Sequence, residues 1–202
     1  RSVDARHSNH EPNKVFQTAN LDAEPRQGPS KDLYPAIGSI VAKHHGANAP
    51  GIPPYVAFQT SRTHVAYAGH LGKRFDPFIA NQASKLPVVD YVGQETGKTS
   101  PAGFFKLPGG MSQERLHSRR ALLEDLDALR TRLDHSADVA AMDRYGREAV
   151  ELLVGRRAQE AFDIEREPQA VRDRYGKHVW HQQALLARRL VEAGAAFVTL
   201  DL

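Results

Sequence analysis

The residue types best suited to chemistry gather near the start of the chain. His7, Asn9, His10 and Glu11 fall within five positions in the segment RHSNHEP. Imidazole and carboxylate groups are ligands that suit zinc and similar cations, and a loop that leads into a helix can also receive an anion. His7 and His10 are therefore candidate metal ligands. A solvated turn whose polar side chains cap the next helix explains the same pattern, because the spacing matches no established motif such as HExxH.

Two other histidine pairs have structural explanations. His178 and His181 lie one helical turn apart and could share a face, but a packed or exposed polar pair near a helix start is the favoured interpretation. His44 and His45 fall in the last turn of a predicted helix, where the helix dipole favours a cation. We assign no ligand role to either pair.

The segment GQETGKTS resembles a phosphate-binding loop but does not complete the pattern. Only three residues separate Gly93 from Gly97, whereas the motif needs four. Pro101 would also oppose the helix that must begin there. The segment therefore predicts no nucleotide site, and we find no nucleophile elbow and no paired carboxylate set elsewhere.

Composition narrows the class of protein. The chain has 202 residues, which suits one domain, and 41% of them are hydrophobic without any apolar run near the roughly 20 residues of a membrane span. Its 27 Lys and Arg are interleaved with 24 Asp and Glu, which argues against nucleic-acid binding. The absence of cysteine excludes disulfides and thiolate metal sites but leaves the compartment open.

Hydrophobic patterning predicts the elements of the first half. A short helix is expected over Glu11–Thr18, and a second over Lys31–His45 with Gly46 ending it. The apolar side chains expected to face inward from the second helix are Leu33, Ile37, Ile40 and Val41. Tyr55–Gln59 has strand composition. Residues 60–110 predict long loops with a small hairpin, which usually serve a site or an interface.

The second half, 112–194, is predicted to be helical and to lead into a strand over 195–202. Helices are expected over Ser112–Arg132 and Ala137–Val154, followed by short helical turns over Arg157–Tyr175 that break at Pro168. A last helix over Lys177–Ala193 is ended by Gly194 and followed by the apolar strand, and its expected inward residues are Val179, Leu186, Leu190 and Val191. A helix running directly into a buried strand is half of a βαβ unit, which predicts an α/β fold with a mostly parallel sheet covered by helices. Both ends of the chain are interpreted as cuts within a larger protein.

Several separated stretches together carry a family resemblance. Their order and spacing resemble a large bacterial family of unknown function whose members are often called sulfatase-like and are grouped with the alkaline phosphatase and sulfatase superfamily. The resemblance covers nearly all of the chain. The stretches are RSVDARHSNHEP, PAIGSIVAKHHG with IPPYVAF, GHLGKRFDPF, AFDIEREPQAVRDRYG and LLARRLVEAGAAFVTLDL.

The resemblance implies a fold and a site beyond what the residues establish. It implies an alkaline phosphatase-like three-layer α/β/α sandwich, incomplete over residues 1–202, with a divalent metal ion in the full-length protein. The resemblance makes His10, Asn9 and Glu11 candidate catalytic residues near the pocket, and the main metal ligands are expected outside this segment. It also implies a twin-arginine signal upstream and a periplasmic location.

The expected function is that of a metal-dependent hydrolase of sulfate or phosphate esters, with a small-molecule or glycan ester as substrate. The isolated segment is expected to be inactive. The alternative is a non-catalytic protein of the same fold that uses Thr60–Gly110 to bind a glycan or a protein partner. Neither a nucleic acid nor a membrane span is expected, and the metal, the substrate and the oligomeric state stay open.

Overall fold

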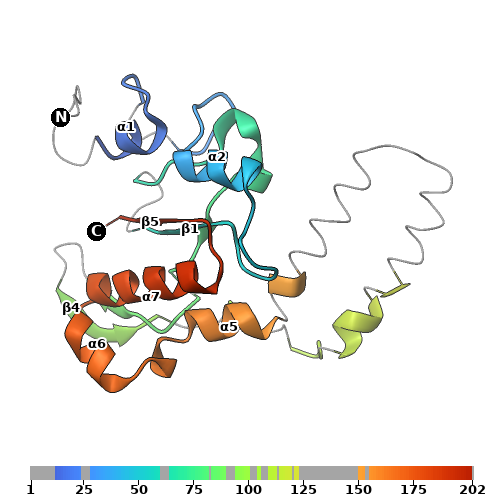
Figure 1. Ribbon diagram of the computed structural model, residues 1–202, viewed down its shortest axis with the longest axis vertical. Helices are drawn as coiled ribbons and strands as arrows, with labels where there is room; N and C mark the ends of the chain where they lie inside the picture. The colour runs from blue at the N-terminus through green and yellow to red at the C-terminus, as the bar shows by residue number, and fades with distance from the viewer. Residues whose placement is uncertain are drawn as a thin grey trace.

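A small parallel sheet lies at the centre of the molecule. The computed structural model describes residues 12–23, 28–59, 64–81, 83–89, 94–100, 104–105, 109–112, 114–119, 121–122, 150–152 and 155–201. Strands β1 (Tyr55–Phe58), β2 (Phe78–Ile79) and β5 (Phe197–Leu200) form a parallel sheet in the order β2-β1-β5. Helices lie on both of its faces (Figure 1). The predicted mixed α/β fold with a parallel sheet is confirmed.

Strand β1 is the middle strand because its sequence is apolar without a break. All four residues of YVAF are buried, which requires cover on both faces of the sheet. Val56 and Phe58 join a core cluster with the helices of the second half, whereas Tyr55 and Ala57 join a cluster with helix α2 (Ile37–His44). The alternation follows from the two-residue period of a strand.

Helix α2 differs from the prediction in two features, its first residue and its buried side. It begins at Ile37 rather than Lys31, since Pro35 disfavours helical geometry at the residue before it. It ends at His44, and Gly46 follows with a φ of 73°. Its buried side is made of small residues rather than Ile37 and Ile40, which are 41% and 42% exposed. The buried residues of α2 are Gly38, Ser39 and Ala42.

Gly38 explains why the small side of α2 packs inward. A Cβ built on Gly38 would lie 2.5 Å from Cε2 of Tyr55, so the aromatic ring occupies the space that a side chain would need. Helix α2 therefore packs against β1 through backbone and small side chains, and its two isoleucines turn outward. Periodicity alone cannot distinguish this arrangement from one with isoleucines inside.

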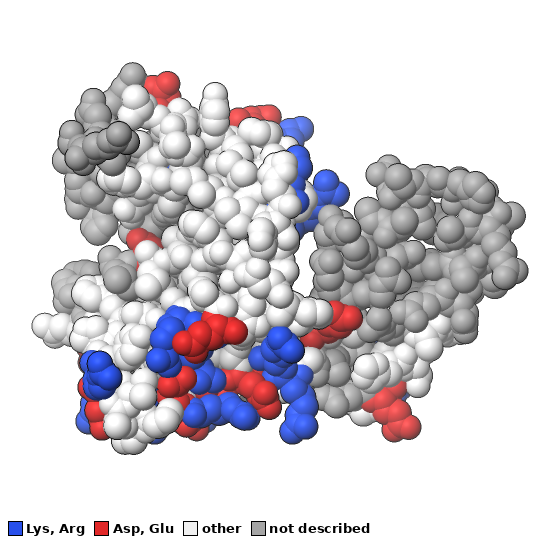
Figure 2. All heavy atoms as spheres, in the orientation of Figure 1, with Lys and Arg blue, Asp and Glu red and all other residues white. Residues whose placement is uncertain are grey.

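The other face of the sheet is covered by helices α7 (Val179–Ala193), α5 (Arg156–Phe162) and α6 (Gln169–Tyr175) (Figure 1). Leu185, Leu186 and Leu190 of α7 are fully buried, and Gly194 ends the helix with a φ of 124° before β5. These elements and the break at Pro168 confirm the predictions, but Val191 is exposed rather than inward. Acidic and basic side chains alternate over this face (Figure 2).

Loops and short elements connect the two halves. The short helical turns η1 (Gly69–Leu71) and η2 (Lys73–Phe75) lead into β2, and β3 (Pro87–Val89) pairs antiparallel with β4 (Glu95–Thr99), which confirms the predicted hairpin. Gly97, Lys98 and Thr99 of the GKTS segment lie in exposed strand β4, whereas the lysine of a phosphate loop lies at the start of a helix. The predicted helices over 112–132 and 137–154 lie mostly outside the described residues, although 114–119, 121–122 and 150–152 are helical. Within the described ranges no helix is long and apolar enough to cross a membrane.

Candidate functional site

The carboxyl ends of the three parallel strands bring polar residues to one edge of the sheet. Asp201 directly follows β5, Gln59 directly follows β1, and Asn81 lies two residues after β2. The backbone N–H of Asp201 donates to the carbonyl of Phe58 at 3.1 Å, which fixes the aspartate beside the end of β1. In open α/β sheets this edge is where ligands bind.

The central pair at this edge consists of His64 and Asp201. Nδ1 of His64 lies 3.0 Å from Oδ2 of Asp201, and Nδ2 of Asn13 donates to Oδ1 of the same carboxylate at 3.3 Å. The Asp201 side chain is 7% exposed and the His64 side chain 24%, so the carboxylate lies beneath an imidazole that solvent can reach. A buried carboxylate bound to Nδ1 orients the ring and favours the tautomer whose lone pair is on Nε2. This form of histidine can act as a general base or as a metal ligand.

Helix α1 (Pro12–Thr18) holds the segment that carries His64. The Gln17 side-chain amide donates to the carbonyl of His64 at 2.7 Å, and its oxygen accepts the backbone N–H of Ala66 at 2.8 Å. Asn13 and Gln17 lie four residues apart and so share a face of the helix. One face of α1 thus contacts both members of the pair. Asn13 binds the Asp201 carboxylate, and Gln17 binds the backbone carbonyl of His64.

A second set of hydrogen bonds joins the ends of β1 and β2. The Asn81 amide donates to the carbonyl of Gln59 at 2.7 Å, and the Gln59 backbone N–H donates to Oδ1 of Asn81 at 3.0 Å. The Tyr67 hydroxyl donates to Oε1 of Gln59 at 3.4 Å. At two of the three strands, β1 and β2, side-chain hydrogen bonds therefore hold the polar edge in addition to the pairing of the strands.

The candidate residues His7, Asn9, His10 and Glu11 lie outside the described residues. In the sequence they immediately precede α1, whose Asn13 contacts Asp201. In the described part of the chain no group of three or more His, Asp and Glu side chains could hold a metal ion. Within that described part, the structure pairs one imidazole with one carboxylate, those of His64 and Asp201.

Sequence reasoning missed Asn13, His64 and Asp201. Asp201 had a signal, because an acidic residue at the carboxyl end of a buried parallel strand lies where α/β proteins bind ligands. His64 had none, since 137 positions separate it from Asp201 and only the fold joins them. Asn13 lies within a predicted helix, and nothing in its neighbours indicates its partner.

The two remaining histidine pairs behave as structural features. His178 caps α7 by accepting the backbone N–H of Trp180 at 3.4 Å, and its ring centroid lies 5.8 Å from that of His181. The Trp180 side chain is 41% exposed, and its ring centroid lies 4.7 Å from that of His178. His44 and His45 are exposed at the end of α2.

One comparison with known proteins gives a match. A family model described as "Protein of unknown function (DUF1501)" matches residues 1–202. No curated protein and no solved structure matches the chain.

Proposed function

We propose that this chain, which belongs to the DUF1501 family, forms part of a hydrolase of sulfate or phosphate esters. The observation that carries the proposal is the His64–Asp201 pair, with 3.0 Å between Nδ1 and Oδ2, at the carboxyl edge of the parallel sheet. An imidazole oriented by a buried carboxylate is suited to proton transfer. Helices on both faces of the sheet also support the three-layer sandwich of the alkaline phosphatase-like fold, and the sulfatase kinship is proposed from the sequence resemblance alone.

In the proposed reaction His64 handles the proton. The nucleophile attacks the sulfur or phosphorus atom, the bond to the ester oxygen breaks, and the oxygen leaves as an alkoxide that takes up a proton from water to give the alcohol. His64 removes the proton from the attacking hydroxyl or water, and Asp201 stabilises the imidazolium that forms. Asn13 holds the second carboxylate oxygen and thereby keeps Asp201 directed at His64.

A divalent metal would supply charge stabilisation at the ester in such a reaction. The types of ligand at the pair fit zinc or a similar cation, but their number does not, since metal sites of this kind use at least three protein ligands. Two candidate ligands lie in the described residues, and we derive no step through a metal from them. His7 and His10 remain proposed as further ligands, with Asn9 and Glu11 beside them.

Chain connectivity supports that part of the proposal. His10 precedes Asn13 by three residues, so their Cα atoms can be no more than about 11 Å apart. Asn13 in turn contacts Asp201. The resemblance further supports export to the periplasm, which we keep as a proposal.

The test uses the product of the complete open reading frame, assayed with para-nitrophenyl phosphate and para-nitrophenyl sulfate and analysed for bound metal by mass spectrometry. His64→Gln and Asp201→Asn should each lower kcat by about 100-fold or more, the usual contribution of general acid–base catalysis. Asp173→Asn on the exposed face of α6 is the matched control and should keep full activity. Wild-type protein without activity on either ester, or site variants as active as the control, would contradict the proposal.

A binding protein without catalysis is the second candidate. Its support is a cavity whose wall includes Val65, Ala66, Tyr67 and Gly69, all within the loop-rich stretch Thr60–Gly110. A glycan or protein partner would then be retained without turnover. The same assay separates the candidates, because a binding protein gives no product from either ester.

A further inference from the structure

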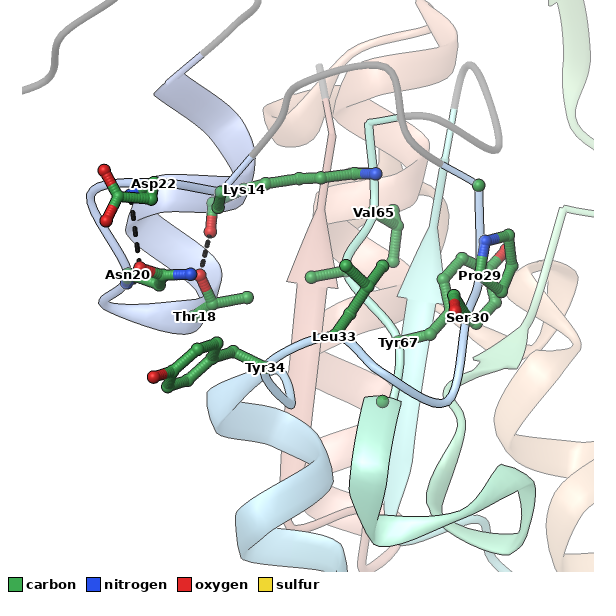
Figure 3. Close-up of a pocket in the computed structure, with 14 residues that line it drawn as sticks. Lys14, Thr18, Asn20, Asp22, Pro29, Ser30, Leu33, Tyr34, Val65 and Tyr67 are labelled. Carbon is green, nitrogen blue, oxygen red and sulfur yellow. Dashed lines mark hydrogen bonds between the residues drawn. The ribbon is translucent and has the colours of Figure 1, made fainter.

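A small cavity is lined by Lys14 and Thr18 of α1, whereas Asn13 and Gln17 are the side chains of α1 that contact Asp201 and His64. It has a volume of about 60 Å³ and is enclosed by α1 with the turn after it, by the segment 28–34 and by the segment 65–69 (Figure 3). Most of its wall is apolar, formed by Leu33, Val65, Ala66 and the two tyrosines Tyr34 and Tyr67. Nothing in the proposed hydrolytic site uses this cavity.

The Lys14 side chain forms one wall of the cavity. Lys14 is 6% exposed, and its chain extends from α1 toward the segment that carries Pro29 (Figure 3). Burial lowers the pKa of the Lys14 ammonium, since the charged form loses hydration. Lys14 also has an interaction within the protein, so a ligand would add to its contacts. A buried cation at the wall of a cavity creates a positive potential inside it.

Two further donors line the same cavity. Oδ1 of Asn20 accepts the backbone N–H of Asp22, and the oxygen of Ser30 accepts the backbone N–H of Asp32. In both contacts the side chain is the acceptor, and among the described residues none accepts the Asn20 amide N–H₂ or the Ser30 hydroxyl hydrogen. Both groups can therefore donate to a ligand. Lys14, Asn20 and Ser30 approach the cavity from three sides (Figure 3). The acidic Asp22 is exposed at the rim, and its carboxylate points away from the cavity.

The size of the cavity limits the ligand. One water-sized group needs about 10–15 Å³ of such volume, so about 60 Å³ accommodates four to six heavy atoms. A tetrahedral oxyanion or a small carboxylate has that size, whereas drug-sized ligands need several hundred Å³. A cation is disfavoured by Lys14, and a neutral apolar group would leave the ammonium and the two donors without a ligand acceptor.

We propose that this cavity binds an oxyanion group of a small ligand, namely a sulfate, a phosphate or a carboxylate, through Lys14 with Asn20 and Ser30 as further donors. The ammonium supplies the charge, and the amide and the hydroxyl fix the orientation of the oxygen atoms. Because the cavity and the His64–Asp201 pair use different side chains of α1, this site does not depend on the hydrolytic function proposed above.

The test measures binding to the complete protein by isothermal titration calorimetry with sulfate, phosphate and acetate at constant ionic strength. Comparison of the three anions shows whether a tetrahedral oxyanion or a carboxylate is preferred. Lys14→Met keeps the length of the side chain without its charge and should weaken binding at least tenfold, which corresponds to about 1.4 kcal/mol. Lys43→Met on the exposed side of α2 is the matched control and should bind as wild type. Asp201→Asn should also bind as wild type, which separates this site from the catalytic proposal.

A second variant tests the cavity without touching Lys14. A Cβ on Gly28 meets nothing within 4 Å, and Gly28 lines the cavity, so Gly28→Leu adds a bulky side chain at the cavity wall without a steric clash at Cβ. This variant should also weaken binding at least tenfold while it keeps the thermal unfolding midpoint close to that of wild type. The proposal is overturned if wild type shows no saturable binding of any of the three anions in the millimolar range, or if Lys14→Met or Gly28→Leu binds as tightly as wild type.

Discussion

The imidazole of His64 and the carboxylate of Asp201 lie 3.0 Å apart although 137 positions separate them in the chain. They meet because β5 pairs in parallel register with β1, which places Asp201 beside the end of β1, and because Gln17 of α1 holds the backbone at His64. The pair therefore depends on α1, β1 and β5 together. A substitution that destabilises one of these elements should therefore also disturb the position of His64.

Gln17 is the first position at which this dependence can be tested. Gln17→Met keeps the volume of the side chain but removes the hydrogen bonds to the His64 carbonyl and the Ala66 N–H. The free energy of unfolding should fall by about 1–3 kcal/mol, because two half-buried backbone groups lose their partners. Urea unfolding measures the loss. Gln169→Met on exposed α6 is the control and should change stability by less than about 0.5 kcal/mol, and equal losses in both variants would contradict a special role for Gln17.

Gly38 gives a prediction with the opposite sign to the usual rule. Replacing a helical glycine by alanine normally stabilises a helix by about 1 kcal/mol. At Gly38 the new Cβ would lie 2.5 Å from the buried Tyr55 ring, so Gly38→Ala should lower the free energy of unfolding by about 1–3 kcal/mol through overpacking. Chemical denaturation of both proteins measures the change. Gly28→Ala, where a Cβ has open space, should be neutral or slightly stabilising, and a stabilised Gly38→Ala would show that α2 does not pack on Tyr55 as described.

The packing of Gly38 against Tyr55 also shows how far the sequence predicts this fold. Continuous apolar runs and terminal glycines predicted β1, α7 and β5, because burial and chain reversal are local requirements. The inward side of α2 was predicted wrongly, since hydrophobic spacing places Ile37 and Ile40 inside. Close approach to Tyr55 instead selects Gly38 and its small neighbours. Which helix packs close enough to need small residues is a property of the tertiary structure.

The site was less predictable than the fold for the same reason. Local density of polar residues directed attention to His7 and His10, whose part in the site stays a prediction. The pair that the structure does bring together joins Asp201 to a histidine from a loop with no distinguishing neighbours. Position at the carboxyl end of a strand could have indicated Asp201. Its partner follows only from the path of the chain.

Glu167 should make the stability of the helical face depend on acid pH. Its carboxylate accepts from Arg189 at 2.6 Å and from Arg188 at 2.7 Å. Burial alone would raise the pKa of Glu167, but the hydrogen bonds from the two arginines outweigh it and hold the pKa below 4.5. The charged form is thus favoured in the folded state, and its stabilisation is present above about pH 4.5 and lost as the pH falls through the lower folded-state pKa.

Glu167→Gln tests this dependence. At neutral pH the variant should be less stable than wild type by about 1–3 kcal/mol, because two guanidinium groups lose a charged acceptor. The difference should shrink as the pH falls below about 4.5, because the unfolded chain takes up the proton first, and it should vanish below the lower folded-state pKa, where folded wild type is also neutral at this position. Urea unfolding across the acid range measures it. Arg166 and Glu160 form an exposed pair at 3.3 Å, so Glu160→Gln serves as the control with little effect at any pH. A difference that stays constant into acid would contradict the assignment.

Tyr55 should make the sheet sensitive to alkaline pH. Burial raises the pKa of its hydroxyl to about 12 from an ordinary value of 10, although the hydrogen bond with Thr199 at 3.2 Å acts in the other direction. Between pH 10 and 12 the unfolded chain therefore loses this proton before the folded protein does. The unfolded state binds fewer protons in that window, so the Tyr55 contribution to stability falls as the pH rises. Tyr55→Phe removes this contribution and, at neutral pH, about 1 kcal/mol of stability with the lost hydrogen bond.

The measurement compares the unfolding free energies of wild type and Tyr55→Phe as the pH is raised. The comparison has to be a difference between the two proteins, because the lowered pKa of Lys14 acts in the opposite sense below pH 10.5 and is common to both. Wild type should begin as the more stable protein and lose its advantage, on the order of 1–2 kcal/mol, as the pH approaches 12. Two parallel curves would mean that the Tyr55 hydroxyl ionises as readily in the folded protein as in the unfolded chain. In that case the close packing of α2 on β1 would leave the hydroxyl end of the ring open to water.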